Sequence, residues 1–109
     1  MRYSIPVLAL CIGLLSTPAF AQAEKQFEYA SETTPELIQL WEDTNGTCRG
    51  ASGDDVKTWA ACAARSVYGA ALNERDWCFG HKDDAGAEMK WHECDANSLR
   101  FPPIDLNTL

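Results

Sequence analysis

The spacing of the cysteines constrains this chain more than any other feature of its sequence. Cys48, Cys62, Cys78 and Cys94 follow one another at intervals of 14, 16 and 16 residues, and the fifth cysteine, Cys11, lies far upstream. An even set of cysteines in a short exported chain is typical of a disulfide framework, and four cysteines allow three pairings. We favour the pairs Cys48–Cys62 and Cys78–Cys94. A zinc site is disfavoured because the chain has no C-x-x-C pair.

Residues 1–21 have the pattern of a secretory signal peptide. Arg2 supplies a positive charge, an apolar stretch follows it, and Ala19-Phe20-Ala21 is a small-residue cleavage site. The apolar stretch is about half as long as a membrane-spanning helix, so we expect no stable membrane anchor. A lipoprotein signal at Cys11 is disfavoured because the bulky Leu10 precedes it. We therefore expect a bacterial protein that is periplasmic or secreted after cleavage following Ala21.

The charge of the chain limits the class of its partner. The formal net charge is −7, and removal of Arg2 with the signal peptide makes it −8 over 88 residues. An acidic protein repels nucleic acid and anionic lipid, so we expect no nucleic-acid partner. Solubility is the explanation of this charge that we favour, and attraction to a cationic protein is the alternative. We expect a monomer with a modest core, stabilised in large part by its disulfides.

Two helices are predicted in the first half of the mature chain, after a polar segment, residues 22–33, that we expect to be flexible. Thr33-x-x-Glu36 fits a capping box, which predicts a helix that begins near Pro35 and ends at Asn45-Gly46. Asp54-Asp55 predicts the start of a second helix that ends between residues 72 and 75. Its predicted apolar stripe comprises Val56, Trp59, Ala60, Ala63, Val67, Ala70 and Ala71.

A β-hairpin is predicted after the helices. Residues 77–81 and 89–94 have the composition of two short strands around a turn-rich segment, although Met89 could instead begin a helical turn. A register with Cys78 opposite Cys94 would put the apolar side chains of both strands on one face. Pro102-Pro103 predicts an extended tail over residues 100–109. The predicted fold is a small disulfide-stapled α+β domain over residues 34–99, with two antiparallel helices and a short C-terminal β-hairpin.

The candidate functional residues lie on this hairpin. The candidate binding surface comprises Trp77, Phe79, His81, Trp91 and His92. A small domain needs most of its four tryptophans in the core, and if any is exposed we expect it to be Trp77 or Trp91.

Two histidines near several acids also suggest a metal site or an acid–base pair. His81 and His92 flank a loop that contains Asp83, Asp84 and Glu88. The loop has neither an H-E-x-x-H arrangement nor the alternating acids of a calcium loop. We therefore expect no bound metal, no cofactor and no catalytic residue.

A set of short motifs runs from Cys48 to Arg100. They are Cys48-Arg49-Gly50, Ser52-Gly53-Asp54-Asp55, Cys62 with Arg65 and Leu72, Trp77-Cys78-Phe79-Gly80, Trp91-x-x-Cys94 and Ser98-Leu99-Arg100. In these motifs the chain resembles small exported four-cysteine proteobacterial proteins of unassigned function, which implies a shared fold and no activity. Through Cys48, Cys62, Arg65 and the helix over residues 55–72 it is more faintly similar to LprI-type lysozyme inhibitors, which are exported, cysteine-stapled and helical. The tryptophan-rich hairpin has no counterpart in that second pattern.

Three classes of function stay open from the sequence. The best supported is a non-enzymatic exported binding module, in its most concrete form an inhibitor of a cationic envelope-active protein such as lysozyme. The second is a small hydrolase that uses His81 or His92 with a nearby acid, and it requires a pocket that contains one histidine. The third is an envelope structural or adhesion factor.

Overall fold

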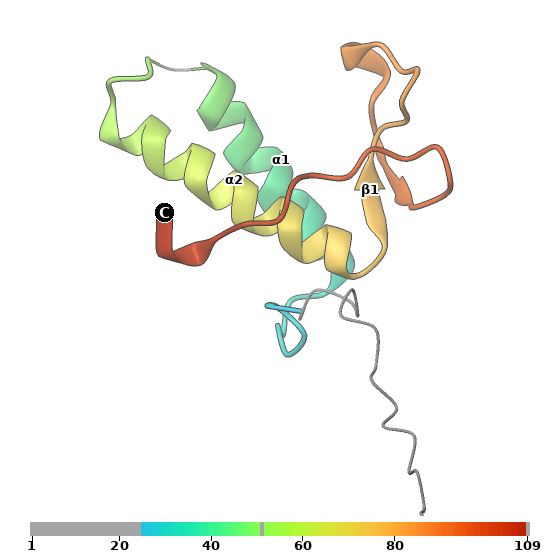
Figure 1. The fold of residues 1–109 in the computed structure, drawn as a ribbon. Coiled ribbons are helices and arrows are strands. Elements are labelled where there is room, and N and C mark those ends of the chain that lie inside the picture. The colour runs from blue at the N-terminus through green and yellow to red at the C-terminus, as the bar shows by residue number, and fades with distance from the viewer. Residues whose placement is uncertain (1–24, 51, 109) are drawn as a thin grey trace, which may run out of the picture.

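The computed structural model of the chain describes residues 25–50 and 52–108, so the predicted signal peptide lies outside the described residues. Two helices, α1 (Thr34–Gly50) and α2 (Val56–Glu74), precede an antiparallel pair of strands, β1 (Trp77–Phe79) and β2 (Trp91–Glu93). Two 3-10 turns, η1 (Gly86–Glu88) and η2 (Leu106–Thr108), complete the elements. The α+β prediction is confirmed: the helices lie side by side and the hairpin extends from the end where α2 finishes (Figure 1). Neither helix combines the length and the apolar composition that a membrane crossing needs, within the described residues.

α1 begins where predicted and continues past its predicted end. Thr33 Oγ1 accepts a hydrogen bond from the Glu36 N–H at 3.2 Å, which caps the first turn. The predicted end at Asn45-Gly46 is wrong, because the helix runs on to Gly50. A glycine inside a helix costs about 1 kcal/mol, but the last turns of α1 are held against α2. Asn45 Oδ1 accepts a hydrogen bond from Arg65 Nη1 at 3.0 Å, and Cys48 is bonded to Cys62.

α2 has its predicted start but presents a different face to the core. Asp55 is the N-cap, and its Oδ1 accepts a hydrogen bond from the Lys57 N–H at 2.9 Å. The predicted stripe is wrong in the first turns, where Val56 is 81% exposed and Trp59 63%. Of the predicted stripe only Ala71 is buried, and the other buried positions of α2 are Thr58, Gly69 and Leu72.

The reason for the rotated face lies in the composition of α2. Its many alanines give only a weak preference between helix faces. The Cys48–Cys62 bond and the fully buried Leu72 therefore determine which face packs on α1.

The core lies between the helices and one face of the hairpin. Its centre comprises Leu37, Trp41, Ala71 and Leu72, and partly buried apolar side chains pack around them. Both disulfides form as predicted, Cys48–Cys62 between the last turn of α1 and the second turn of α2, and Cys78–Cys94 at the hairpin. Cys78 is fully buried, whereas Cys48 and Cys62 are partly exposed.

The register of the hairpin differs from the predicted register by two residues. Cys78 lies opposite His92 rather than opposite Cys94, and Phe79 lies opposite Trp91. Because side chains alternate along a strand, a shift of two residues keeps each one on its predicted face. Cys94 follows β2 and reaches Cys78 diagonally, and its N–H donates to Asp76 O at 2.8 Å.

The segments on either side of this core also contact α2. The Glu74 carboxylate accepts hydrogen bonds from the backbone N–H groups of Gln26 and Phe27, at 3.1 and 2.9 Å. The C-terminal segment crosses the helices (Figure 1), and a Cβ added at Gly69 would lie 2.8 Å from the Phe101 ring. Residues 100–105 lack regular structure, as the prolines predict, but η2 replaces the extended end that we expected.

Candidate functional site

The structure divides the predicted binding surface between two faces of the hairpin. Trp77, Phe79 and Trp91 pack against the helical core. The Trp41 ring is the centre of this contact, with ring centroids 4.4 Å from Phe79 and 5.2 Å from Trp91. These half-buried aromatic side chains therefore attach the hairpin to the helices rather than forming an open surface.

The most exposed tryptophan is not on the hairpin. Trp59 of α2 is 63% exposed, whereas Trp77 and Trp91 are only partly exposed and Trp41 is buried. The expectation that a hairpin tryptophan would be the exposed one is therefore wrong. The Trp91 indole Nε1 is buried without a hydrogen-bond partner among the described residues.

The two histidines of the predicted surface lie together on the other face. Their rings stack with centroids 4.0 Å apart and planes inclined by 19°. In an uninterrupted hairpin residues 81 and 92 would point to opposite faces, since one is odd and the other even in a register that pairs 79 with 91. The contact between the rings therefore requires a break in the strand.

Gly80 supplies that break. Its φ of +84° lies in the region that favours glycine, and β1 ends immediately before it. The Gly80 N–H donates to Lys90 O, and Gly80 O accepts from the Leu99 N–H, each at 3.0 Å. The backbone is thus fixed on both sides, and His81 continues into an antiparallel bridge with Ser98.

Two carboxylates hold His81, and we define the histidine cluster as His81, His92, Asp84 and Asp95. His81 Nε2 lies 2.9 Å from Asp95 Oδ2, and His81 Nδ1 lies 3.4 Å from Asp84 Oδ2. The same Asp84 oxygen accepts the backbone N–H of His81 at 2.9 Å. Both ring nitrogens of His81 therefore face a carboxylate oxygen.

His92 is held by backbone carbonyls instead. Its Nδ1 lies 2.7 Å from Glu93 O, and its Nε2 lies 3.1 Å from Gly80 O. A neutral imidazole has a single N–H, so it donates to one of these carbonyls at a time.

Asp95 is oriented by the turn that it begins. Its Oδ1 accepts hydrogen bonds from the Asn97 N–H at 2.9 Å and from Ser98 Oγ at 3.1 Å. These bonds leave Oδ2 directed at His81. The side chains of His81 and Asp95 are 35% and 54% exposed, so the cluster is open to solvent.

The contact between His81 and Asp95 shifts the pKa of each group. The hydrogen bond with Asp95 raises the pKa of His81 above 6.5, and the same bond lowers the pKa of Asp95 below 3.8. The contribution of His81 to stability is complete below pH 6.5 and is lost as the pH rises through its raised pKa. The contribution of Asp95 is complete above pH 3.8 and is lost as the pH falls through its lowered pKa. The pair therefore favours the folded state most between pH 3.8 and 6.5.

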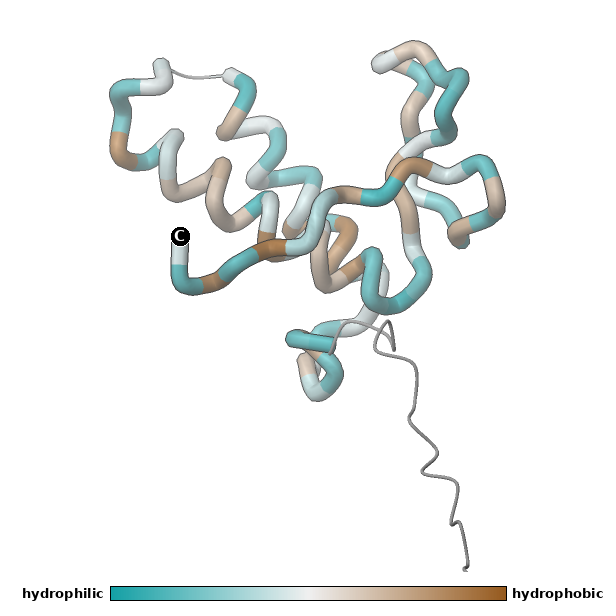
Figure 2. Tube along the Cα trace, viewed as in Figure 1, coloured by the Kyte–Doolittle hydropathy of each residue, from teal (hydrophilic) through white to brown (hydrophobic). Residues whose placement is uncertain are grey.

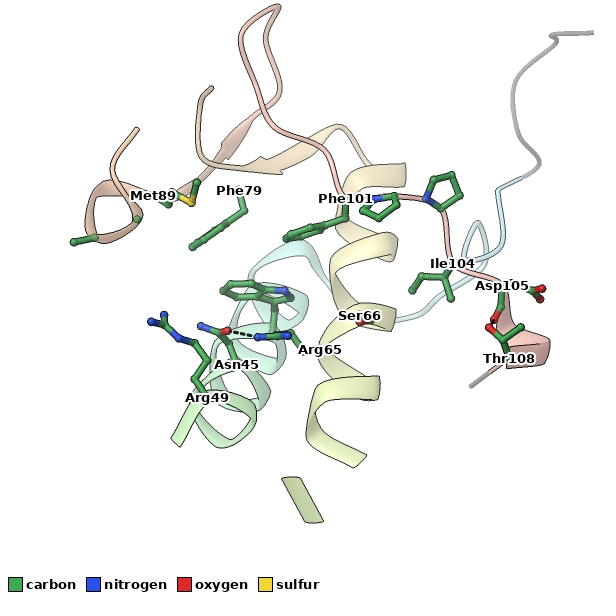
Figure 3. A pocket seen from close by; sticks show the side chains of 15 residues that line it. Asn45, Arg49, Arg65, Ser66, Phe79, Met89, Phe101, Ile104, Asp105 and Thr108 are labelled. Atoms are coloured by element: carbon green, nitrogen blue, oxygen red, sulfur yellow. Dashed lines mark hydrogen bonds between the residues drawn. The ribbon is translucent and has the colours of Figure 1, made fainter. Parts of the chain in front are cut away.

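A separate groove of about 960 Å³ lies between the helices, the hairpin tip and the C-terminal segment. Trp41, Phe79 and Phe101 are among its apolar lining residues, and Arg49 and Arg65 line it from the helices (Figure 3). Its arginines suit an anionic group rather than a cationic one. Neither His81 nor His92 lines this groove. The groove is therefore not the histidine-containing pocket that the hydrolase hypothesis requires.

Sequence reasoning identified both histidines but missed Asp95, the acid that lies closest to His81. It named Asp83, Asp84 and Glu88, of which only Asp84 bonds to an imidazole among the described residues. Asp95 follows the second strand, 14 residues from His81, and becomes a neighbour only once the hairpin is formed. The pattern Asp95-x-Asn97-Ser98 is typical of an Asx turn and was the one available signal.

Comparisons with known proteins do not place the chain in a family. No protein-family model, no curated protein and no solved structure matches it. The two resemblances inferred from its motifs stay predictions, and its function has to be argued from the geometry.

Proposed function

We propose that the chain is an exported, non-catalytic binding module that docks on a cationic protein through its acidic arm, which we define as residues 80–98. The charge density of this arm carries the proposal. Its five acids, Asp83, Asp84, Glu88, Glu93 and Asp95, outnumber Lys82 and Lys90, which makes a formal net charge of −3 over 19 residues with neutral histidines. Residues 34–74 carry the same net charge over 41 residues.

The arm is also pre-organised for docking. The Cys78–Cys94 disulfide closes its base, and the bridge between His81 and Ser98 joins its two loops. Figure 2 shows hydrophilic residues along much of these loops. A partner that binds a fixed loop loses less conformational entropy than one that has to order it.

Export is part of the proposal and sets the class of partner. Two disulfides are consistent with a periplasmic or extracellular protein, and we propose that residues 1–21 direct the chain there. Among envelope-active proteins, lysozymes are usually cationic, so an acidic arm would be steered toward them at low ionic strength. Inhibition of a lysozyme is therefore the first activity to measure.

The experiment measures muramidase activity of each lysozyme class with the oxidised mature protein. An arm variant, Asp83→Asn with Glu88→Gln and Glu93→Gln, removes three exposed charges outside the histidine cluster. A control variant with the same charge change, Glu28→Gln with Glu36→Gln and Glu42→Gln, alters exposed acids elsewhere. We expect the arm variant to inhibit about tenfold less well and the control to inhibit within about twofold of the native protein.

Two results would refute parts of this proposal. No inhibition of any lysozyme class at micromolar protein would exclude the lysozyme partner. Equal losses in the two triple variants would show that the total charge, and not the arm, determines binding. Capture of partners from periplasmic extract under non-reducing conditions, with the arm variant as a control, then tests for another cationic partner and separates binding from a structural or adhesive role.

One contact favours hydrolysis as a second candidate function. The 2.9 Å contact of His81 Nε2 with Asp95 is that of a carboxylate that orients a general base, although His81 Nδ1, the nitrogen that would accept the proton, faces Asp84 Oδ2 at 3.4 Å. The nearby hydroxyl of Ser98, however, bonds to Asp95 rather than to an imidazole. If the protein hydrolyses an ester or glycan substrate, His81→Gln should abolish that activity, and an unchanged rate would exclude this role.

A further inference from the structure

We infer that His81, His92 and Asp95 form a binding site for a divalent transition-metal ion of the zinc and copper class. Each residue offers one ligand atom, and these three atoms lie within 4.8 Å of one another. Imidazole nitrogen and carboxylate oxygen are donors that both ions accept in proteins. The inference replaces the expectation of a surface histidine pair without a metal, and it does not depend on the proposed docking function.

The donor atoms are close to the spacing that a bound ion requires. Zinc bonds of about 2.0–2.2 Å place the donors of a tetrahedral site about 3.3 Å apart. His81 Nε2 and Asp95 Oδ2 are 2.9 Å apart, and the His92 ring is stacked on His81. Because the stacked planes of the two imidazoles are inclined by only 19°, the His92 ring has to turn before one of its nitrogens points at the ion that His81 and Asp95 hold. The ion would take the place of the hydrogen between His81 and Asp95, and that proton would pass to solvent.

The partners that orient metal ligands are already in position around the histidines. A metal-bound histidine normally donates its second ring N–H to a carboxylate or a backbone carbonyl. With His81 Nε2 on the ion, His81 Nδ1 faces Asp84 Oδ2 at 3.4 Å. Both nitrogens of His92 lie on backbone carbonyls, so the one that binds the ion gives up its contact with Glu93 O or Gly80 O, and the other can donate its N–H to a carbonyl.

The carboxylate ligand is oriented in the same way. Asp95 Oδ1 is held by Asn97 and Ser98, so Oδ2 is the oxygen available to the ion. This arrangement distinguishes the site from a chance group of exposed acids, whose side chains are not fixed. The partial exposure of His81 and Asp95 leaves room for water to fill the remaining coordination positions.

The test is a titration of the oxidised, tag-free mature protein after removal of metal with a chelator. Zinc chloride and copper(II) sulfate are titrated separately in a calorimeter, and we expect one ion per chain in at least one of the two titrations. Imidazole NMR signals of both histidines should shift together as zinc is added. Electron paramagnetic resonance of the copper complex should show coupling to two nitrogen nuclei.

Variants locate the binding. His81→Gln, His92→Gln and Asp95→Asn are each expected to weaken the affinity at least about tenfold, which is the lower end of the effect seen when metal sites are altered. Asp83→Asn removes an exposed carboxylate of the same loop and should leave the affinity within about twofold. Circular dichroism of the metal-free variants checks that each one folds, and the NMR shifts of the native protein decide the question if a variant does not.

Three results would overturn the inference. The first is no stoichiometric binding of either ion at about 100 µM metal. The second is binding that the three ligand variants leave unchanged. The third is an equal loss in Asp83→Asn, which would indicate attraction of cations to the arm as a whole.

Discussion

The helical pair and the acidic arm each depend on one disulfide, but they are stabilised in different ways. α1 and α2 share a buried apolar face that includes Leu37 and Leu72. The arm extends from a hairpin, β1 and β2, whose strands of only three residues are too short to be stable alone. It depends on its covalent closure and on the packing of Phe79 and Trp91 against Trp41. The helices form the scaffold, and the arm depends on its contacts with them.

This difference explains why the hydrogen-bonded cluster of polar side chains lies on the arm and not on the helices. The helix faces that meet must be apolar, and burial leaves little freedom in their side chains. The outer face of the arm contributes nothing to the core, so His81, Asp84 and Asp95 can be arranged by hydrogen bonds alone. Rigid closure at the base then keeps that arrangement in place.

Removal of the arm disulfide should have the largest effect on stability. The two disulfides close loops of similar length, 14 and 16 residues, so the loop entropy that each removes from the unfolded state is nearly equal, about 3 kcal/mol. Cys78→Ala with Cys94→Ala also removes the sulfur of the fully buried Cys78, and we expect a total loss of about 4 kcal/mol in urea unfolding.

The corresponding helix variant is the control for this comparison. Cys48→Ala with Cys62→Ala should cost about 3 kcal/mol or less, and the arm should keep its structure, because its contacts with Trp41 are unchanged. Near-ultraviolet circular dichroism reports on Trp91 of the arm and on Trp77 of the neighbouring strand. If the helix variant disorders the arm as much as the arm variant does, the two regions are not stabilised separately.

Gly80→Ala should damage the arm while leaving the helices intact. An alanine at φ +84° is strained, and its Cβ would lie 2.7 Å from Met89 Cγ. We expect a loss of about 2 kcal/mol and a displaced His81. The measurements are urea unfolding, helical circular dichroism and zinc affinity. A variant that loses its helical signal along with zinc binding would contradict the separation of the two regions.

The elements of the fold were predictable because their signals are local. Thr33 and Asp55 mark helix starts through bonds to backbone groups only two or three residues away. The face of the hairpin was also predictable, since alternation survives a register shift of two residues. The end of α1 was not, because contacts with α2 at Asn45 and Cys48 override the local preference of Asn45-Gly46.

The histidine cluster could be predicted only in part. The sequence places two histidines near acids, but it does not show that Gly80 reverses the side on which His81 emerges. It also does not show that the residues after β2 return to pair with His81. Both are tertiary features, and the choice of Asp95 over Asp83 and Glu88 follows from them.

Gly69→Ala tests how the C-terminal segment packs on the helical pair. Alanine gains about 1 kcal/mol of helix propensity, but its Cβ would meet the Phe101 ring at 2.8 Å. We expect a net loss of about 1 kcal/mol in urea unfolding. In a Phe101→Ala background only a 3.3 Å contact with Trp41 Nε1 remains, so the same change should become stabilising by up to about 1 kcal/mol. No change of sign between the two backgrounds would show that Phe101 does not pack there.

Gly46→Ala should have the smallest effect on stability. It tests the end of α1, which the structure places later than the sequence predicts. Gly46 lies inside α1, and nothing lies within 4 Å of a Cβ added there. Alanine should therefore stabilise the protein by about 0.5–1 kcal/mol, because glycine is the costlier residue in a helix. Gly53→Ala, at an equally open position outside the helices, should change stability much less. A destabilising Gly46→Ala would mean that α1 ends at Asn45-Gly46 in solution, which would leave Cys48 on a loop and the helical pair shorter than the structure shows.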